Sequence, residues 1–169
     1  KDYYLGMGAL INSLHDSGFT GRFFYGYRGE MPPFAKGKTR TEGQREVLTL
    51  PNGMKIIFIP LAVGIHFAQY KPDFMMELLN GEASDVDAIH YYDPDIVVKA
   101  RWITMETWSQ DGVAVCEDMT FSYFPRRHPR RLTWRNWIAT HPELSIKTEY
   151  DRYFNTGFVS CPAKHKSIL

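Results

Sequence analysis

The chain has 169 residues, of which 44% are hydrophobic and 15% aromatic, and its formal net charge at pH 7 is +1. A chain of this length and composition can bury a core as one domain, here residues 1–169, and general disorder is excluded. The small net charge gives no reason to expect a nucleic-acid partner. Both cysteines, Cys116 and Cys161, lie in apolar stretches and are interpreted as core residues in a reducing compartment.

No apolar run approaches the roughly 20 residues that a membrane span requires, so no transmembrane segment is expected. We therefore expect a cytoplasmic protein, with peripheral attachment to a membrane as an alternative. The oligomeric state is not indicated by the sequence.

Apolar periodicity and turn residues predict helices that alternate with strands. The predicted elements, in chain order, are a helix over 4–14, a strand over 22–27, a polar loop over 28–43, a strand over 54–60, a helix over 67–81, strands over 86–92 and 96–98, a helix over 100–110, a strand over 112–118, a helix over 129–142 and a strand over 153–162. Helices between strands imply a largely parallel or mixed sheet that is covered on both faces.

Several glycines and one proline are expected to punctuate these elements. The first helix should stop near Gly18, and Pro72 suits the first turn of the helix over 67–81, with Gly81 as its C-terminal cap. Gly157 is expected to break the last strand.

Two aspartates, Asp93 and Asp95, follow the strand predicted over 86–92 and flank Pro94. In open α/β sheets, ligands bind beyond the carboxyl ends of the strands, where Asp93 would lie. Residues i and i+2 of an extended chain project to the same side, so both carboxylates can approach one hard cation, with Mg²⁺ or Mn²⁺ as the natural candidates. The alternative is a pair of solvated turn aspartates.

The stretch "DAIHYYDPDIVV" (87–98) resembles the D-x-D segment of nucleotide-sugar glycosyltransferases with the GT-A fold, especially the group that includes glycogenin and bacterial lipopolysaccharide galactosyltransferases. Three further stretches match this family in order: "DYYLGMGALINSL" (2–14), "FAQYKPDFMMELL" (67–79) and "YFNTGFVSCP" (153–162). The order and spacing of the four stretches are more specific than any one of them.

The resemblance implies a Rossmann-like GT-A fold, an open mixed and mainly parallel sheet with helices on both faces. It implies a metal-dependent enzyme that transfers a hexosyl group from a nucleoside diphosphate sugar, a uridine one by resemblance, to a carbohydrate, lipid or protein acceptor. The site residues that it implies are Asp2 and Tyr3 near the donor's base, Lys71 near the donor, Asp93 and Asp95 as ligands of Mn²⁺ or Mg²⁺, and Asn155, Thr156 and Gly157 facing the donor sugar.

The chain departs from the family's pattern in three places. Pro94 stands between the aspartates where a small residue is commoner. The family's opening strand would precede Lys1, and its downstream half, with a histidine metal ligand, would follow Leu169. The resemblance therefore implies a domain that is incomplete at both ends.

Simple physical chemistry supports these roles and also gives a structural alternative for each. A lysine near a diphosphate stabilises negative charge, but Lys71 is also expected as a surface lysine whose stem covers apolar residues. Asn155 offers a donor and an acceptor to hydroxyls, and Gly157 lets the backbone approach a ligand, yet the pair also fits a strand bulge. Tyr3 would stack on a base or pack against the helix.

No residue stands out as a general base for an acceptor hydroxyl. None is needed if the anomeric configuration is retained, as in the resembled group, and Glu117 and Asp118 at a strand end are candidates if it is inverted.

A basic cluster, "PRRHPRR" (125–131), precedes Trp134 and Trp137. Arginine forks suit a diphosphate, an anionic acceptor or a membrane surface, but a solvated basic loop is the simpler interpretation.

Two other functions remain open at the level of sequence. "YYDPDIVV" also fits the motif of haloacid-dehalogenase-like magnesium phosphatases, although that family carries the motif on its first strand. The domain would alternatively bind a nucleotide sugar without catalysis. Turnover of a nucleotide sugar, hydrolysis of a phosphomonoester, and binding without turnover distinguish the three.

Overall fold

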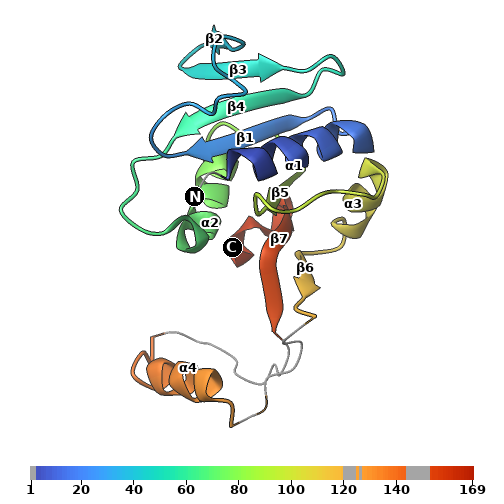
Figure 1. Cartoon of the computed structure of the whole chain (residues 1–169). Helices are drawn as coiled ribbons and strands as arrows, with labels where there is room; N and C mark the ends of the chain where they lie inside the picture. Colours follow the sequence, from blue (N-terminus) through green and yellow to red (C-terminus); the bar gives the residue numbers. More distant parts are fainter. Residues whose placement is uncertain (1–2, 120–124, 126, 144–152) are drawn as a thin grey trace.

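The computed structural model describes residues 3–119, 125, 127–143 and 153–169 (Figure 1). Its elements are α1 (Tyr4–Ser17), β1 (Arg22–Tyr27), β2 (Arg40–Glu42), β3 (Arg45–Thr49), β4 (Lys55–Pro60), α2 (Phe67–Asn80), β5 (Ala88–Tyr92), α3 (Trp102–Trp108), β6 (Ala114–Glu117), α4 (Pro129–Ala139), β7 (Phe154–Pro162) and the 3₁₀ helix η1 (Ala163–Ile168). The strands form two sheets: sheet A has the order β1-β4-β3-β2, and sheet B has the order β5-β7-β6.

The predicted fold class, a GT-A sheet that is open and mainly parallel, is wrong. In sheet A only β1 and β4 run parallel, whereas β3 is antiparallel to both β4 and β2. In sheet B both pairs are antiparallel. The chain is an α/β protein with one mixed and one antiparallel sheet, because α2 leads from β4 into a different sheet and does not return the chain to the edge of sheet A.

The two faces of sheet A are covered by different helices. Alternate residues of a strand point to opposite faces. On one face, Ile56 and Phe58 of β4 join a buried cluster with Leu10 and Leu14 of α1. On the other face, a second cluster places β4 against α2; its buried members are Val47, Ile57, Ile59, Leu78 and Ala83. Sheet A is therefore the middle layer between α1 and α2.

The predicted end of the first helix is confirmed. Gly18 adopts a left-handed conformation with φ of 94°, and its N–H donates to the carbonyl oxygens of His15 and Leu14. Only glycine reaches this conformation without steric cost. The chain therefore turns sharply from α1 into β1.

Other local predictions are corrected by the structure. Pro72 lies inside α2 and not in its first turn, whereas the prediction of Gly81 as the C-cap is confirmed, with φ of −131° and its N–H donating to the carbonyl oxygen of Leu78. Residues 96–98 form no strand, β2 lies within the loop predicted over 28–43, and β3 forms in a stretch for which no element was predicted. Gly157 does not break β7, but the β6–β7 register shifts opposite it. The adjacent Val115 and Cys116 pair with Val159 and Asn155, so residues 156–158 of β7 have no partner in β6, as in the strand bulge considered above.

Cys161 is buried as predicted, whereas Cys116 is exposed. No helix in the described part of the chain is long and apolar enough to cross a membrane.

Candidate functional site

The turn that carries both aspartates is fixed where β5 ends beside β7. The backbone N–H of Asp93 donates to the carbonyl oxygen of Gly157 over 2.7 Å, which continues the antiparallel β5–β7 pairing by one residue. The N–H of Ile96 donates to the carbonyl oxygen of Asp93 over 3.2 Å and closes the turn. The first aspartate is thereby held against the strand that contains Asn155 and Thr156.

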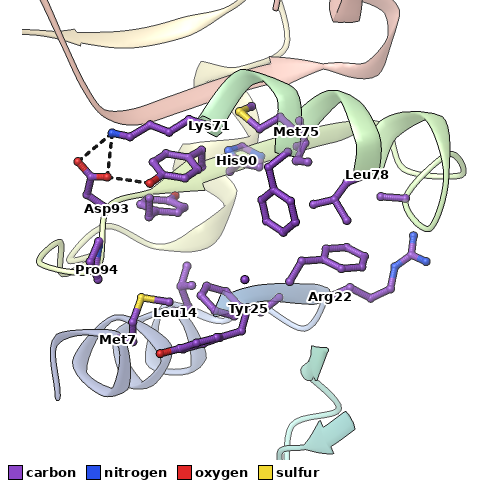
Figure 2. A pocket seen from close by; sticks show the side chains of 18 of the residues that line it. Met7, Leu14, Arg22, Tyr25, Lys71, Met75, Leu78, His90, Asp93 and Pro94 are labelled. Carbon is purple, nitrogen blue, oxygen red and sulfur yellow. Dashed lines mark hydrogen bonds and ion pairs between the residues drawn. The ribbon is translucent and has the colours of Figure 1, made fainter. Parts of the chain in front are cut away.

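Lys71 on α2 forms an ion pair with Asp93 (Figure 2). Its Nζ lies 2.9 Å from Oδ1 and 3.1 Å from Oδ2 of Asp93. The ammonium group also donates to the carbonyl oxygen of Thr156 over 3.1 Å. The Lys71 side chain is only 9% exposed, so its charge is largely removed from water and needs this compensation. The ion pair joins α2, β5 and β7.

Tyr91 completes the surroundings of the Asp93 carboxylate. Its hydroxyl donates to Oδ1 of Asp93 over 2.8 Å, and its ring centroid lies 4.9 Å from the Lys71 ammonium. Burial, followed by the hydrogen bond to Asp93, raises the pKa of Tyr91 far above its usual value. Tyr91 is therefore a protonated donor at neutral pH. Tyr91 was not among the predicted site residues, although a residue two positions before Asp93 on a strand projects to the same side.

Gly157 packs closely against two polar side chains at this corner. A Cβ atom there would lie 2.8 Å from Oδ1 of Asn155 and 3.2 Å from Oδ2 of Asp93. The same Asn155 oxygen accepts the N–H of Gly157 over 2.7 Å. The glycine thus allows a side-chain amide and a carboxylate to come together on one side of β7.

The start of α1 lies against the same turn. A Cβ atom at Gly6 would stand 2.2 Å from the carbonyl oxygen of Pro94, so the helix backbone approaches the turn closely. Tyr3, which is 54% exposed, lines the same cavity as Lys71, Asp93 and the exposed Asp95. Asp2, the other residue predicted near the base, lies outside the described residues.

A cavity of about 1620 Å³ opens beside this cluster. Figure 2 shows Lys71, Asp93 and Pro94 at one end and apolar side chains, among them Leu14, Met75 and Leu78, farther along it. The cavity therefore has a polar, charged mouth at the end of β5 and an apolar interior.

Predicted site residues from three distant segments thus meet at one place. Lys71, Asp93 and Gly157 are in contact, and Asn155 and Thr156 flank them. The structure does not bring the other candidates to this mouth: Asp118 pairs its N–H with the carbonyl oxygen of Tyr153 at the β6–β7 end, and Glu117 is the last residue of β6.

The basic cluster is likewise outside the cavity lining in the described part of the chain. His128 there serves as the N-cap of α4, where its Nδ1 accepts the N–H of Arg130 over 3.3 Å. The following Trp134 stacks on Tyr153 with ring centroids 6.2 Å apart.

The donor set at the turn suits a hard divalent cation bound together with a phosphorylated ligand. Asp93 and Asp95 offer only oxygen atoms, and Mg²⁺ is commonly held by one or two carboxylates plus water and substrate phosphates. Among the described residues there is no group of three or more His, Cys, Asp or Glu side chains that would hold a metal alone. Asp93 and Asp95 are thus the carboxylates that the turn offers, and Asp93 is already held by Lys71 and Tyr91.

No protein-family model matches the chain, and no curated protein matches its sequence.

Proposed function

We propose that the protein is a metal-dependent glycosyltransferase that uses a nucleoside diphosphate sugar, most simply a uridine one, with the donor bound at the mouth beside Asp93. The observation that supports this best is the meeting of Lys71, Asp93 and Gly157, with Asn155 beside them, although these three residues lie 22 to 86 positions apart along the chain. The mouth combines carboxylates for a cation with an ammonium for phosphate oxygens. Asn155 lies beside the mouth but outside the cavity lining, and its Oδ1 accepts the N–H of Gly157.

The chemistry of sugar transfer explains why these groups belong together. When the bond between the anomeric carbon and the diphosphate breaks, negative charge grows on the departing phosphate. A divalent cation held by Asp93 and Asp95 supplies Lewis-acid stabilisation of that charge. Lys71 contributes a second positive charge that is already ordered by its contacts with Asp93 and the carbonyl oxygen of Thr156.

The ion pair also makes the site responsive to its ligands. Without a divalent ion, the Lys71 ammonium neutralises Asp93. A divalent cation at the same carboxylate repels that ammonium, and phosphate oxygens offer it a new partner. We therefore expect the metal and the diphosphate to bind cooperatively.

Calorimetric titration with uridine diphosphate, with and without Mn²⁺, tests the proposal. The variants are Asp95→Asn and the double variant Asp93→Asn/Asp95→Asn, and the matched control is Asp16→Asn, whose side chain is 80% exposed on α1. We expect Mn²⁺-dependent binding to the parent and the control, weaker binding to Asp95→Asn, and none to the double variant. Circular dichroism must show that each variant is folded, because Asp93→Asn leaves Lys71 without its counter-charge.

Turnover distinguishes this proposal from the two others. Release of uridine diphosphate from a uridine diphosphate sugar supports a transferase. Metal-dependent binding without turnover of any donor sugar supports a binding domain. Absence of binding in the folded parent, together with hydrolysis of a phosphomonoester, would replace the proposal with the phosphatase.

A further inference from the structure

The segment between Asp118 and Glu143 concentrates positive charge. Residues 119–142 contain five arginines and no aspartate or glutamate. The whole chain has 20 lysines and arginines against 19 acidic residues, so the remainder of the chain is net negative. A local excess of one sign of charge attracts partners of the opposite sign even when the net charge of the molecule is near zero.

Helix α4 carries this charge at a surface away from the proposed donor site. Figure 1 shows α4 beyond the Phe154 end of β7, apart from sheets A and B. Arg130 near the start of α4 and Arg127 just before it are both exposed. No residue of α4, which is described in full, lines the large cavity. The charge of α4 is therefore available to a second partner.

Two tryptophans lie beside these arginines on the helix. Trp134 is 45% exposed and Trp137 is 51% exposed. Arg130, Trp134 and Trp137 are spaced i, i+4 and i+7, so they lie along one side of α4. Arginine binds phosphate oxygens through two parallel hydrogen bonds, and tryptophan combines an apolar ring with an N–H donor. This side of the helix thus offers contacts both to phosphates and to apolar groups.

The start of β7 extends the apolar part of this surface. Trp134 stacks on Tyr153 with an interplanar angle of 15°, and the carbonyl oxygen of Tyr153 accepts the N–H of Asp118 over 3.0 Å. The next residues in the chain after Tyr153 and Asp118 are Phe154 and Met119, which are 41% and 93% exposed. Apolar side chains that gather on an exposed surface beside polar ones mark a site of interaction with a protein or a membrane.

We propose that this surface, which we call the α4 surface, binds membranes that contain anionic phospholipids. The arginines bind the lipid phosphates, and the tryptophan rings lie at the depth of the headgroups. With 11 residues, α4 is too short to span a bilayer and lies along the membrane plane. The residues of the α4 surface are Met119, Arg127, Arg130, Trp134, Trp137 and Phe154.

A membrane fits the α4 surface better than a nucleic acid does. An aliphatic side chain such as Met119 gains little from a phosphate backbone, but it gains free energy from burial at the boundary of the acyl chains. The charge distribution also sets an orientation, because an anionic membrane attracts α4 and repels the net negative remainder of the chain. The inference does not rest on the proposed function, and either can fail alone.

Cosedimentation of the 169-residue chain with lipid vesicles tests the proposal. Vesicles of phosphatidylcholine alone are compared with vesicles of phosphatidylcholine and phosphatidylglycerol in equal parts. We expect binding to the anionic vesicles to be tighter by about tenfold or more, and this preference to decline as salt is added. Equal affinity for the two kinds of vesicle, or binding to neither, would overturn the proposal.

Replacement of the arginines tests whether α4 supplies the charge. Arg127→Gln/Arg130→Gln should weaken binding to the anionic vesicles by about tenfold or more. The matched control is Arg40→Gln/Arg101→Gln, which removes two charges that are exposed elsewhere on the molecule. An equal loss of affinity in the control would show that the interaction depends on total charge and would overturn the assignment to α4.

Replacement of one tryptophan tests the apolar contact. Trp137→Ala should weaken binding to the anionic vesicles by about tenfold. The matched control is Trp108→Ala on α3, whose ring is 47% exposed and also stacks on one neighbouring ring, that of Phe158. Unchanged binding of Trp137→Ala, or an equal loss in the control, would contradict the insertion of Trp137 at the membrane.

A single-stranded oligonucleotide, at the same concentration of phosphate groups as the vesicles, distinguishes the two kinds of polyanion. Tighter binding to the oligonucleotide than to the anionic vesicles would replace the membrane with a nucleic acid and overturn the proposal. Circular dichroism compares the folding of each variant with that of the parent. The α4 variants should bind uridine diphosphate as the parent does, because α4 does not line the cavity.

Discussion

Lys71 and Asp93 form the ion pair on which the proposed site depends. Replacement of the lysine should affect metal binding and diphosphate binding in opposite directions. Lys71→Met keeps the aliphatic stem but removes the charge that lies 2.9 Å from the Asp93 carboxylate. We expect the variant to bind Mn²⁺ about tenfold more tightly or better, because a competing cation is lost. Uridine diphosphate should bind it more weakly, because its phosphates lose a positive partner. Calorimetry with each ligand measures both, and a fall in Mn²⁺ affinity would contradict the assignment of the carboxylate as a metal ligand.

His90 gives the protein a pH-dependent stability at the level of one side chain. Its ring lies edge-on to Trp102 with centroids 5.0 Å apart, and within the described residues its buried Nδ1 has no hydrogen-bond partner. Burial lowers the pKa of His90 from 6.5 to about 4. The unfolded state therefore binds the His90 proton more readily than the folded state does. The stability that comes from keeping His90 neutral and buried is fully present above about pH 6.5 and is lost as the pH falls toward 4.

The loss should reach at most about 3 kcal/mol in the free energy of unfolding. His90→Phe removes the titrating group and should flatten the curve of stability against pH between about 6.5 and 4. Urea unfolding at several pH values measures this. A variant with the same slope as the parent would show that another group controls the acid sensitivity.

At the scale of one element, α1 contains two glycines with opposite expected effects. A Cβ atom at Gly8 would meet nothing within 4 Å, whereas one at Gly6 would meet the backbone oxygen of Pro94 at 2.2 Å. Gly8→Ala should stabilise the protein by up to about 1 kcal/mol through helix propensity. Gly6→Ala should destabilise the protein by about 1–3 kcal/mol, because either α1 or the turn at Pro94 must shift to make room for the methyl group. Chemical denaturation compares them, and equal stability of the two variants would contradict the close packing of α1 on the turn.

The sequence predicted some elements well because their patterns are local. The apolar residues of α1 recur at helical spacing, and those of β4 form a continuous run, because these are the residues that each element buries. The β2–β3 hairpin was missed because β2 is polar and β3 carries only two apolar residues, yet a signal was present. Gly43 and Gln44 connect Glu42 to its partner Arg45, and Gly43 has φ of 62°, as in a two-residue hairpin turn with glycine first.

At the scale of the whole molecule, strand pairing could not be predicted from the alternation of helices and strands. Alternation is compatible with α2 placing β5 beside β4 or in a second sheet, and only long-range packing decides between these. The site shows the same limit. Residue chemistry singled out Asp93, but its contact with Lys71 depends on how α2 crosses the end of β5, and no local pattern carries that information.

Sheets A and B share one core, so we expect them to unfold together. Leu10 and Phe58 beside sheet A belong to a cluster that also contacts Tyr92 of sheet B and the neighbouring Trp102. Leu10 is fully buried, and Leu10→Ala should cost about 2–5 kcal/mol. Cys161 in β7 is also fully buried. If the two sheets unfold together, Leu10→Ala should lower the free energy of the opening that exposes Cys161 by the same amount.

Thiol labelling measures that coupling directly. In a Cys116→Ser background, which removes the exposed thiol, a labelling reagent reports only the opening of the structure around Cys161. Where reclosing is faster than labelling, a loss of about 2 kcal/mol or more speeds the reaction by about 30-fold or more. Leu10→Ala should therefore accelerate labelling of Cys161 by this factor, although the substitution lies beside the other sheet. An unchanged rate, with global stability lowered, would mean that sheet B opens independently of sheet A and that the shared cluster does not couple them.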